Sequence, residues 1–359
     1  MSEPKPKPQK KSQLPQQPKP KPQPKKKSQQ AQGEKQTKKA KAGQTQTQTQ
    51  QPAAKKQKIR IGILGGGPLE QSLAQYWLAK GNKVKMAVSS SWLEPKLKEK
   101  LPKVTTAILK GHDLKILRAR LLDRDLLVMV LTDQGNKFTP ETYHDTYVLR
   151  ARAIASAVNT LTNLKQVICL STIDLYGDVR GHWVTEATPV KGEGWRYKLS
   201  VETERTLLKL NTPQRQVCIL RLGLIYESHQ QLYQKMRSEY GRTLPGDGRR
   251  VMNWIHHNDL LAAINFIQEQ RLSGIYNLTN GDPIEERILL ESITNKYCLK
   301  QLNWNPQKPV QGLSMRVSNQ KLITAGYVFQ HPRLLPWKTD PPPTTTPNPS
   351  PNPADPATP

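Results

Sequence analysis

The chain has 359 residues, 30 of them prolines, and its 55 Lys and Arg against 28 Asp and Glu give a formal net charge of +27. Residues 1–58 carry about half of that charge, because they hold sixteen lysines and two glutamates. They contain no aromatic, valine or isoleucine residue. Such a composition cannot bury enough apolar surface to offset the entropy of ordering, so we expect a disordered basic arm over 1–57 and a disordered Pro/Thr-rich tail over 336–359. No apolar run approaches the ~20 residues that cross a bilayer. The three separate cysteines match no zinc spacing or disulfide framework, which favours a soluble cytoplasmic protein.

The lysines of the arm favour a partner with dense negative charge, namely nucleic acid, an acidic protein or a membrane surface. The arm has no aromatic side chain to stack on bases, so binding to nucleic acid would be salt-sensitive and independent of sequence. A solubilising tether without a specific partner is the alternative.

Order is predicted from Ile59 onward, where Ile59–Leu64 reads as a strand that runs into a glycine turn and then a helix closed by Gly81. Further strands are predicted at Lys83–Val88, Leu126–Leu131, Gln166–Leu170 and Gln216–Leu222, and helices at Tyr147–Thr160 and Leu199–Leu210. Alternating strands and helices are typical of an α/β fold with a doubly wound parallel sheet of the Rossmann type. We expect this Rossmann core over residues 58–225, and a smaller C-terminal substrate-side subdomain, interleaved with the sheet, over 226–335.

The glycine turn has the order of a dinucleotide-binding loop, in which backbone N–H groups at the helix start bind a diphosphate. Gly65 and Gly67 fill the first two positions of G-x-G-x-x-G, Leu69 begins the helix, and Glu70 replaces the third glycine. A glutamate there adds bulk, and its negative charge opposes a diphosphate unless the side chain turns away.

The second strand is followed by serines where NAD-specific enzymes usually carry a carboxylate for the ribose. Ser89 and Ser90, with Lys96 and Lys98 nearby, suit a 2′-phosphate better, so NADP is preferred over NAD. A solvent-exposed polar loop that touches no ligand is the alternative.

Six short motifs follow in order along the chain. They are Ser171–Asp178 (STIDLYGD), Thr185–Pro189 (TEATP), Ile219–Tyr226 (ILRLGLIY), Asn253–Leu260 (NWIHHNDL), Gly274–Leu278 (GIYNL) and Arg316–Leu322 (RVSNQKL). Together they resemble the extended and atypical branch of the short-chain dehydrogenase/reductase superfamily, the sugar-nucleotide epimerase/dehydratase type, over roughly residues 59–335. The resemblance implies NAD or NADP as cofactor and a small-molecule or sugar-nucleotide-like substrate.

The resemblance also implies residue roles. Thr172 corresponds to the hydroxyl that hydrogen-bonds the substrate oxygen, and Ser171 is expected to contact the cofactor. The residues expected on the substrate side are Tyr176, Arg221, Asn253 and His256. Arg221 on an apolar strand is alternatively a member of a buried ion pair. His256 and Asp259 are expected to brace the substrate-side loop, with Asp259 capping a helix over Leu260–Gln268. The adjacent His256 and His257 lack a third ligand, so no metal site is predicted.

The family's acid–base pair, Tyr-x-x-x-Lys, is absent from the helix where the resemblance requires it. If Tyr197 is the tyrosine, its partner is Val201; if Glu204 sets the register, the pair is Arg196 and Ser200. Tyr197 acting alone is the remaining catalytic candidate, although a phenol with a pKa of ~10 is a poor base at neutral pH.

These observations leave two hypotheses. The first is an NAD(P)-binding, epimerase/dehydratase-like protein with weak or absent oxidoreductase chemistry. The second is a non-catalytic, dinucleotide-sensing scaffold or assembly factor that its basic arm recruits to an anionic partner.

Overall fold

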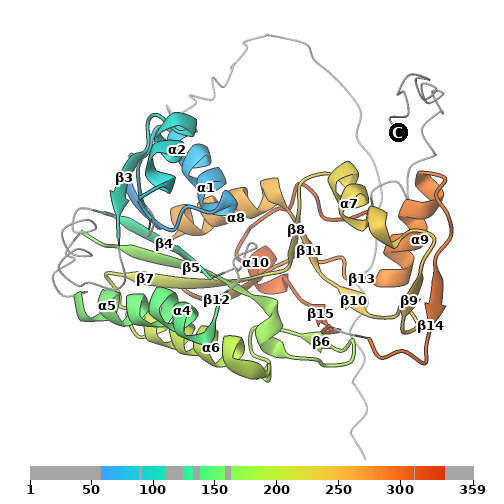
Figure 1. The fold of residues 1–359 in the computed structure, drawn as a ribbon. Coiled ribbons are helices and arrows are strands. Elements are labelled where there is room, and N and C mark those ends of the chain that lie inside the picture. Colours follow the sequence, from blue (N-terminus) through green and yellow to red (C-terminus); the bar gives the residue numbers. More distant parts are fainter. Residues whose placement is uncertain are drawn as a thin grey trace, which may run out of the picture. The chain divides into compact units, whose positions relative to one another are not determined.

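In the computed structural model, which describes residues 58–88, 91–109, 124–131, 138–157, 163–310 and 312–335, a seven-stranded parallel sheet forms the centre (Figure 1). Its strands are β1 (Arg60–Leu64), β2 (Lys83–Val88), β3 (Thr105–Ile108), β4 (Leu126–Val130), β5 (Gln166–Thr172), β7 (Gln216–Leu222) and β12 (Gly274–Leu278). The spatial order is β12-β7-β5-β4-β1-β2-β3, so the chain reverses its direction of travel across the sheet between β1 and β4. Ligands of such sheets bind beyond the carboxyl ends of the strands at this reversal.

Helices cover both faces of the sheet, as the predicted doubly wound fold requires (Figure 1). One face packs against α1 (Pro68–Ala79), α2 (Leu93–Lys100) and α8 (His257–Gln270). The other packs against α4 (Pro140–Tyr143), the π-helical turn η1 (His144–Val148), α5 (Leu149–Ala157) and α6 (Gly194–Leu208). All five residues of β4 are buried because they alternate between these two cores, which explains why that strand is apolar throughout.

The strand predictions agree closely with the structure, and the helix boundaries agree less well. β2 and β7 have the predicted bounds, whereas β3, with two threonines in four residues, was not predicted. α6 begins at Gly194, five residues before the predicted Leu199, because Trp195 and Tyr197 in its first turn are two residues apart and do not follow the helical apolar period. The helix expected from Tyr147 begins in η1 and continues to Ala157, and residues 158–160 lie outside the described residues.

Short elements after β5 build a smaller second part beside the sheet. They are η3 (Ile173–Tyr176), β6 (Trp183–Val184), β8 (Leu224–Tyr226), α7 (His229–Met236), η4 (Arg237–Glu239), β9 (Thr243–Pro245), β10 (Val251–Met252), β11 (Trp254–His256), β13 (Ile284–Glu285), α9 (Glu286–Lys296), β14 (Asn303–Asn305), β15 (Arg316–Val317) and α10 (Gln320–Thr324). The strands pair in twos, as β8–β11, β9–β14, β6–β15 and β10–β13. Between these pairs, α8 and β12 return to the main sheet, so the two halves of the chain are interleaved. Within the described residues, no helix is long and apolar enough to cross a membrane.

A buried ion pair ties α6 to the sheet. The Arg221 guanidinium on β7 donates to both carboxylate oxygens of Glu204 on α6, at 2.7 and 3.4 Å, and both side chains are about 96% buried or more. Arg221 also lies 4.9 Å from the centroid of the Tyr176 ring. The alternative prediction for Arg221, a buried ion pair, is confirmed.

The motif residues continue this contact into a buried polar network. The Tyr176 hydroxyl donates to Asn277 Oδ1 at 2.7 Å, and the backbone N–H of Asn277 donates to Glu186 at 2.8 Å. The Asn277 amide donates in turn to the Ser318 carbonyl. Together with Arg221, these residues bring five of the six motifs of the sequence into one structural brace.

We expect Arg221→Met to lower the free energy of unfolding by about 3–5 kcal/mol, because it leaves the Glu204 carboxylate buried without its cation. Urea denaturation at pH 7 measures the loss.

Arg152→Met is the matched control for this loss, since Arg152 pairs with Glu202 at the surface of α5 and α6. It should cost about 1 kcal/mol or less. Equal, small losses in the two variants would contradict the assigned role of the Glu204–Arg221 pair.

Candidate functional site

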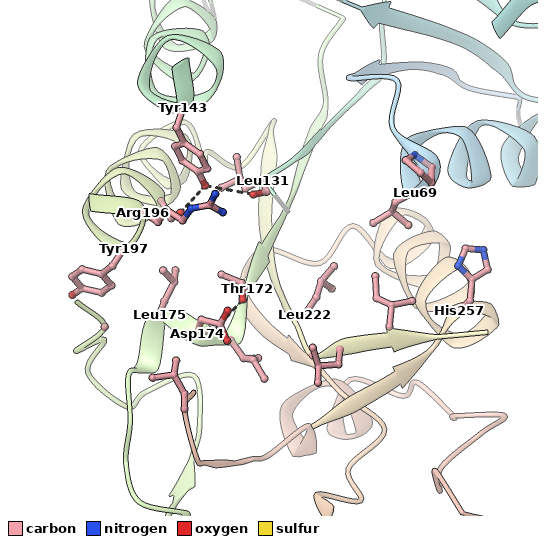
Figure 2. Close-up of a pocket in the computed structure, with 18 of the residues that line it drawn as sticks. Leu69, Leu131, Tyr143, Thr172, Asp174, Leu175, Arg196, Tyr197, Leu222 and His257 are labelled. Atoms are coloured by element: carbon pink, nitrogen blue, oxygen red, sulfur yellow. Dashed lines mark hydrogen bonds between the residues drawn. The ribbon is translucent and has the colours of Figure 1, made fainter. Parts of the chain in front are cut away.

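A cavity of about 860 Å³ lies at the carboxyl ends of the central strands. Its walls come from the start of α1, the ends of β4, β5 and β7, the first turns of α6, and the segment around β8 and α7. Figure 2 shows Leu69 and His257 on one side of it, and Tyr143 and Arg196 on the other. Its polar lining residues are Ser72, Tyr143, Thr172, Asp174, Glu193, Arg196, Tyr197, Ser200, Glu227, Gln231 and His257.

The Glu204–Arg221 pair decides which face of α6 meets the cavity. Residues four apart on a helix share a face, so Glu204, Ser200 and Arg196 form one stripe. Arg196 and Ser200 both line the cavity, whereas Val201 faces a separate groove between α5 and α6. Of the two predicted registers, the structure brings the Arg196 and Ser200 pair to the cavity.

Ser200 is buried and its hydroxyl is hydrogen-bonded to a tyrosine that the sequence analysis did not single out. Tyr143 Oη lies 2.7 Å from Ser200 Oγ and also donates to the Leu131 carbonyl at 3.4 Å (Figure 2). Tyr143 is far from Ser200 in the sequence and lies in a short helix after β4, and no local pattern links the two residues. The contact is a product of the tertiary fold.

Thr172 ends β5 and reaches the cavity together with Asp174. Thr172 Oγ1 accepts the backbone N–H of Asp174 at 3.1 Å, which starts the η3 turn (Figure 2). Desolvation by the cavity wall raises the pKa of the Asp174 carboxyl, and a hydrogen bond from the Thr172 hydroxyl lowers it by less. Asp174 is therefore a carboxyl at the cavity that is poised to hold a proton more readily than usual, and the sequence analysis missed it.

Tyr197 borders the cavity, but its hydroxyl is engaged elsewhere. The hydroxyl donates to the Val190 carbonyl at 2.9 Å, and Figure 2 shows the ring directed away from Thr172. Lys198, the next residue, lines the groove between α5 and α6 and does not reach the cavity. The predicted catalytic residues Thr172 and Tyr197 thus share the cavity wall without being bonded to one another.

The four predicted substrate-side residues do not line the cavity. Tyr176 and Arg221 belong to the buried network, and Asn253 bonds the backbone of Met315 and Val317. His256 is the N-cap of α8, where its Nδ1 accepts the Asn258 N–H at 3.1 Å. All four brace the chain around the site.

The predicted helix cap at Asp259 is wrong, because α8 already begins at His257. The Asp259 carboxylate instead accepts backbone N–H groups of Gln330 and His331, both at 2.7 Å, and so braces the end of the described chain. His257, adjacent to the predicted His256, does line the cavity, and desolvation lowers the pKa of its imidazole. Among the described residues, no cluster of three His, Cys, Asp or Glu side chains is placed to hold a metal ion.

The glycine turn, where a dinucleotide diphosphate is expected, is filled by a side chain of the protein itself. Glu70 is 91% buried, and its carboxylate accepts the backbone N–H groups of Gly67 and of Glu70. A Cβ built on Gly65 would collide with Glu70 Oε1, and one on Gly67 would lie 2.8 Å from Oε2. In this conformation the turn does not fit a diphosphate in the usual position.

The other residues predicted to contact the cofactor lie in different surroundings. Leu69 lines the cavity with its neighbour Pro68. The Ser171 hydroxyl is buried and has no hydrogen-bond partner within the described part of the chain. Ser89 and Ser90 lie outside the described residues, so the preference for NADP stays a prediction.

No protein-family model and no curated protein matches the sequence. Solved structures do match the fold. A protein described as an NAD-dependent epimerase/dehydratase from Methylobacillus flagellatus aligns with a TM-score of 0.59 at 23% identity, covering 77% of this chain and 95% of that one. UDP-glucose 4-epimerase of Thermus thermophilus, in complex with NAD, aligns at 0.60 and 18%, covering 75% and 94%. MoeE5 in complex with UDP-glucose and NAD aligns at 0.58 and 15%, covering 74% and 91%.

The described chain shares its fold with these NAD-dependent epimerase/dehydratase structures. The fold that the motifs suggested is confirmed, and the matches extend over nearly the whole length of each neighbour.

We expect Asp174→Asn to raise stability at neutral pH by less than about 1 kcal/mol, because the carboxyl is desolvated yet still reaches solvent. Its folded pKa is raised, so the native state holds the proton more tightly than the unfolded chain does. The stability associated with that proton is present at acid pH and is lost as the pH rises through the folded pKa.

Urea denaturation at a series of pH values tests this expectation. The advantage of Asp174→Asn should shrink toward acid pH, whereas Glu291→Gln, at an exposed position of α9, should show no such trend. An advantage that grows as the pH falls would contradict the prediction.

Proposed function

We propose that this chain is an epimerase/dehydratase-like member of the short-chain dehydrogenase/reductase superfamily with weak or absent oxidoreductase chemistry, and that its cavity binds an anionic, sugar-nucleotide-like ligand. The observation that carries the proposal is the α6 face at the cavity, which presents Arg196 and Ser200. The planar guanidinium of Arg196 carries a positive charge and several N–H donors, which suit the binding of an anion.

The other hydroxyls at the cavity support weak chemistry. Tyr197 commits its hydroxyl to the Val190 carbonyl, and Tyr143 and Ser200 are bonded to one another. Thr172 and Asp174 form a hydroxyl–carboxyl pair at the cavity that can exchange a proton with a bound ligand. Such a pair supports slow proton transfer without the paired phenol and amine of the superfamily.

The ligand class is supported by size and analogy. A cavity of about 860 Å³ is within the range of pockets that hold a ligand of nucleotide-sugar size. MoeE5, which shares the fold, holds UDP-glucose and NAD. Because Glu70 fills the glycine turn, we expect NADP(H) to bind weakly to this chain, ahead of NAD(H).

Titration calorimetry with UDP-glucose as probe tests the anion site. We expect Arg196→Ala to weaken binding roughly 10- to 100-fold, the usual effect of losing a charge-assisted hydrogen bond. The purified protein should also show no appreciable nicotinamide-linked turnover.

Lys198→Ala is the control, since it removes the same charge two residues away on a face that does not reach the cavity. Equal weakening by the two variants would argue for a diffuse electrostatic effect. Rapid NADP-linked turnover that Tyr197→Phe abolishes would refute the proposed loss of chemistry.

The second candidate, a non-catalytic scaffold in the cytoplasm, is favoured by the arm, whose residues 1–58 carry a formal charge of +14. In this role the folded part is a platform and the arm recruits an anionic partner, namely nucleic acid, an acidic protein or a membrane surface.

Deleting residues 1–57 should leave the melting temperature of the folded part unchanged, because a segment of this composition has almost no apolar side chains to add to a core. The same deletion should abolish retention on a heparin column at moderate salt. Retention that persists after the deletion would assign the anion-binding surface to the folded part.

A further inference from the structure

The start of α1 is built to bind an anion. Gly67 is the N-cap of this twelve-residue helix, and the N–H groups of a helix's first turn have no partner within the helix. They point along the positive end of the helix dipole, which is why phosphates bind at such places. Pro68, at the first helical position, supplies no N–H, so an anion at this end of α1 can be bound only by the other N–H groups of the turn.

Glu70 supplies the anion from within the chain. It stands at the third helical position, from which a glutamate side chain reaches back to the N–H of the N-cap residue. Its carboxylate accepts that Gly67 N–H and its own N–H, so two of the donors a diphosphate would use are taken. Burial raises the pKa of the Glu70 carboxyl more than these two hydrogen bonds lower it.

The carboxylate also takes the space that the glycines leave open. Absent side chains at Gly65 and Gly67 normally let a diphosphate approach the backbone. Here both positions face Glu70, with Oε1 over Gly65 and Oε2 over Gly67. Gly65 has a φ of +129°, a conformation that L side chains rarely adopt. The turn therefore keeps a backbone shape that favours glycine, while the Glu70 carboxylate occupies the space beside it.

The filled cradle lies next to the cavity in the chain. Pro68 and Leu69, which directly follow Gly67, line the cavity described above, whereas Glu70 does not. A dinucleotide would have to place its diphosphate where a carboxylate already lies, against both bulk and like charge.

We propose that Glu70 is an internal plug of the diphosphate site, which occupies the anion cradle of α1 and keeps a dinucleotide from binding there in the usual position. This inference rests on the proposed function and deepens it, because it names the group that makes cofactor binding weak. The plug acts on dinucleotide binding and is separate from the Arg196 and Ser200 face, which is proposed to bind the sugar-nucleotide-like ligand.

Fluorescence titration of the full chain with NADPH tests the plug in two variants. Glu70→Gly restores the third glycine and empties the cradle, so its Kd for NADPH should fall at least about tenfold, as two N–H donors become available for charge-assisted bonds. Glu70→Gln keeps the bulk and removes the charge, so its Kd should lie between those of Glu70→Gly and the wild type. Glu99→Gln, at an exposed position of α2, is the control and should leave the Kd unchanged.

Far-UV circular dichroism shows whether each variant folds, and if Glu70→Gly does not, the Glu70→Gln comparison decides. NADPH affinities of the folded Glu70 variants that equal the wild-type value overturn the plug and leave the proposed function intact. Rapid turnover by the wild type overturns the proposed function, whatever the Glu70 variants do. Tighter binding by the Glu70 variants with no gain in turnover supports both.

Discussion

The buried ion pair between Glu204 and Arg221 is the contact on which the arrangement of the site depends. A helix packed against a sheet can rotate about its own axis. Successive residues are about 100° apart around that axis, so a shift of the register by one residue brings different side chains to the sheet edge. Removing an unpaired charge from water costs far more than any such rotation gains, so α6 stays where Glu204 finds Arg221. Arg196 and Ser200 then follow on the same stripe and face the cavity, and Tyr197 turns toward the Val190 carbonyl.

The motifs that suggested the superfamily are mostly structural. Tyr176, Asn277 and Glu186 come from three motifs and form one chain of hydrogen bonds under the site. Asn253 and Asp259 hold the backbone of later segments in the same way. Buried polar groups of this kind must all be satisfied together, so losing one leaves the others unpaired. The braces can therefore persist in a chain whose cavity residues have changed, and they say more about fold than about reaction.

Charged groups lie at the cavity and beside it. At one end the Glu70 carboxylate cancels the positive start of α1, and at the other the Arg196 guanidinium supplies a cation on α6. Between them Thr172 and Asp174 offer a hydroxyl and a carboxyl whose pKa is raised by desolvation. This charge distribution connects the two proposals, since one concerns the ligand that is attracted and the other the ligand that is kept out.

The sheet and the helices on its two faces could be predicted from the amino-acid sequence, because strand and helix periodicities are local and the apolar run of β4 requires burial on both sides. The sequence also shows that Glu70 replaces the third glycine of the turn. It limits the residue pair on α6 that corresponds to Tyr-x-x-x-Lys to two possible registers. It could not choose between those registers, pair Tyr143 with Ser200, or show which way Glu70 turns. Each outcome depends on a particular contact. Glu204 and Arg221 are 17 positions apart, Tyr143 and Ser200 are 57 apart, and Glu70 folds back over glycines up to 5 positions away. Packing and the pairing of buried charge select these contacts among conformations that are locally equivalent. Only the tertiary structure sets the positions of such groups relative to one another, and with them the chemistry that the cavity can support.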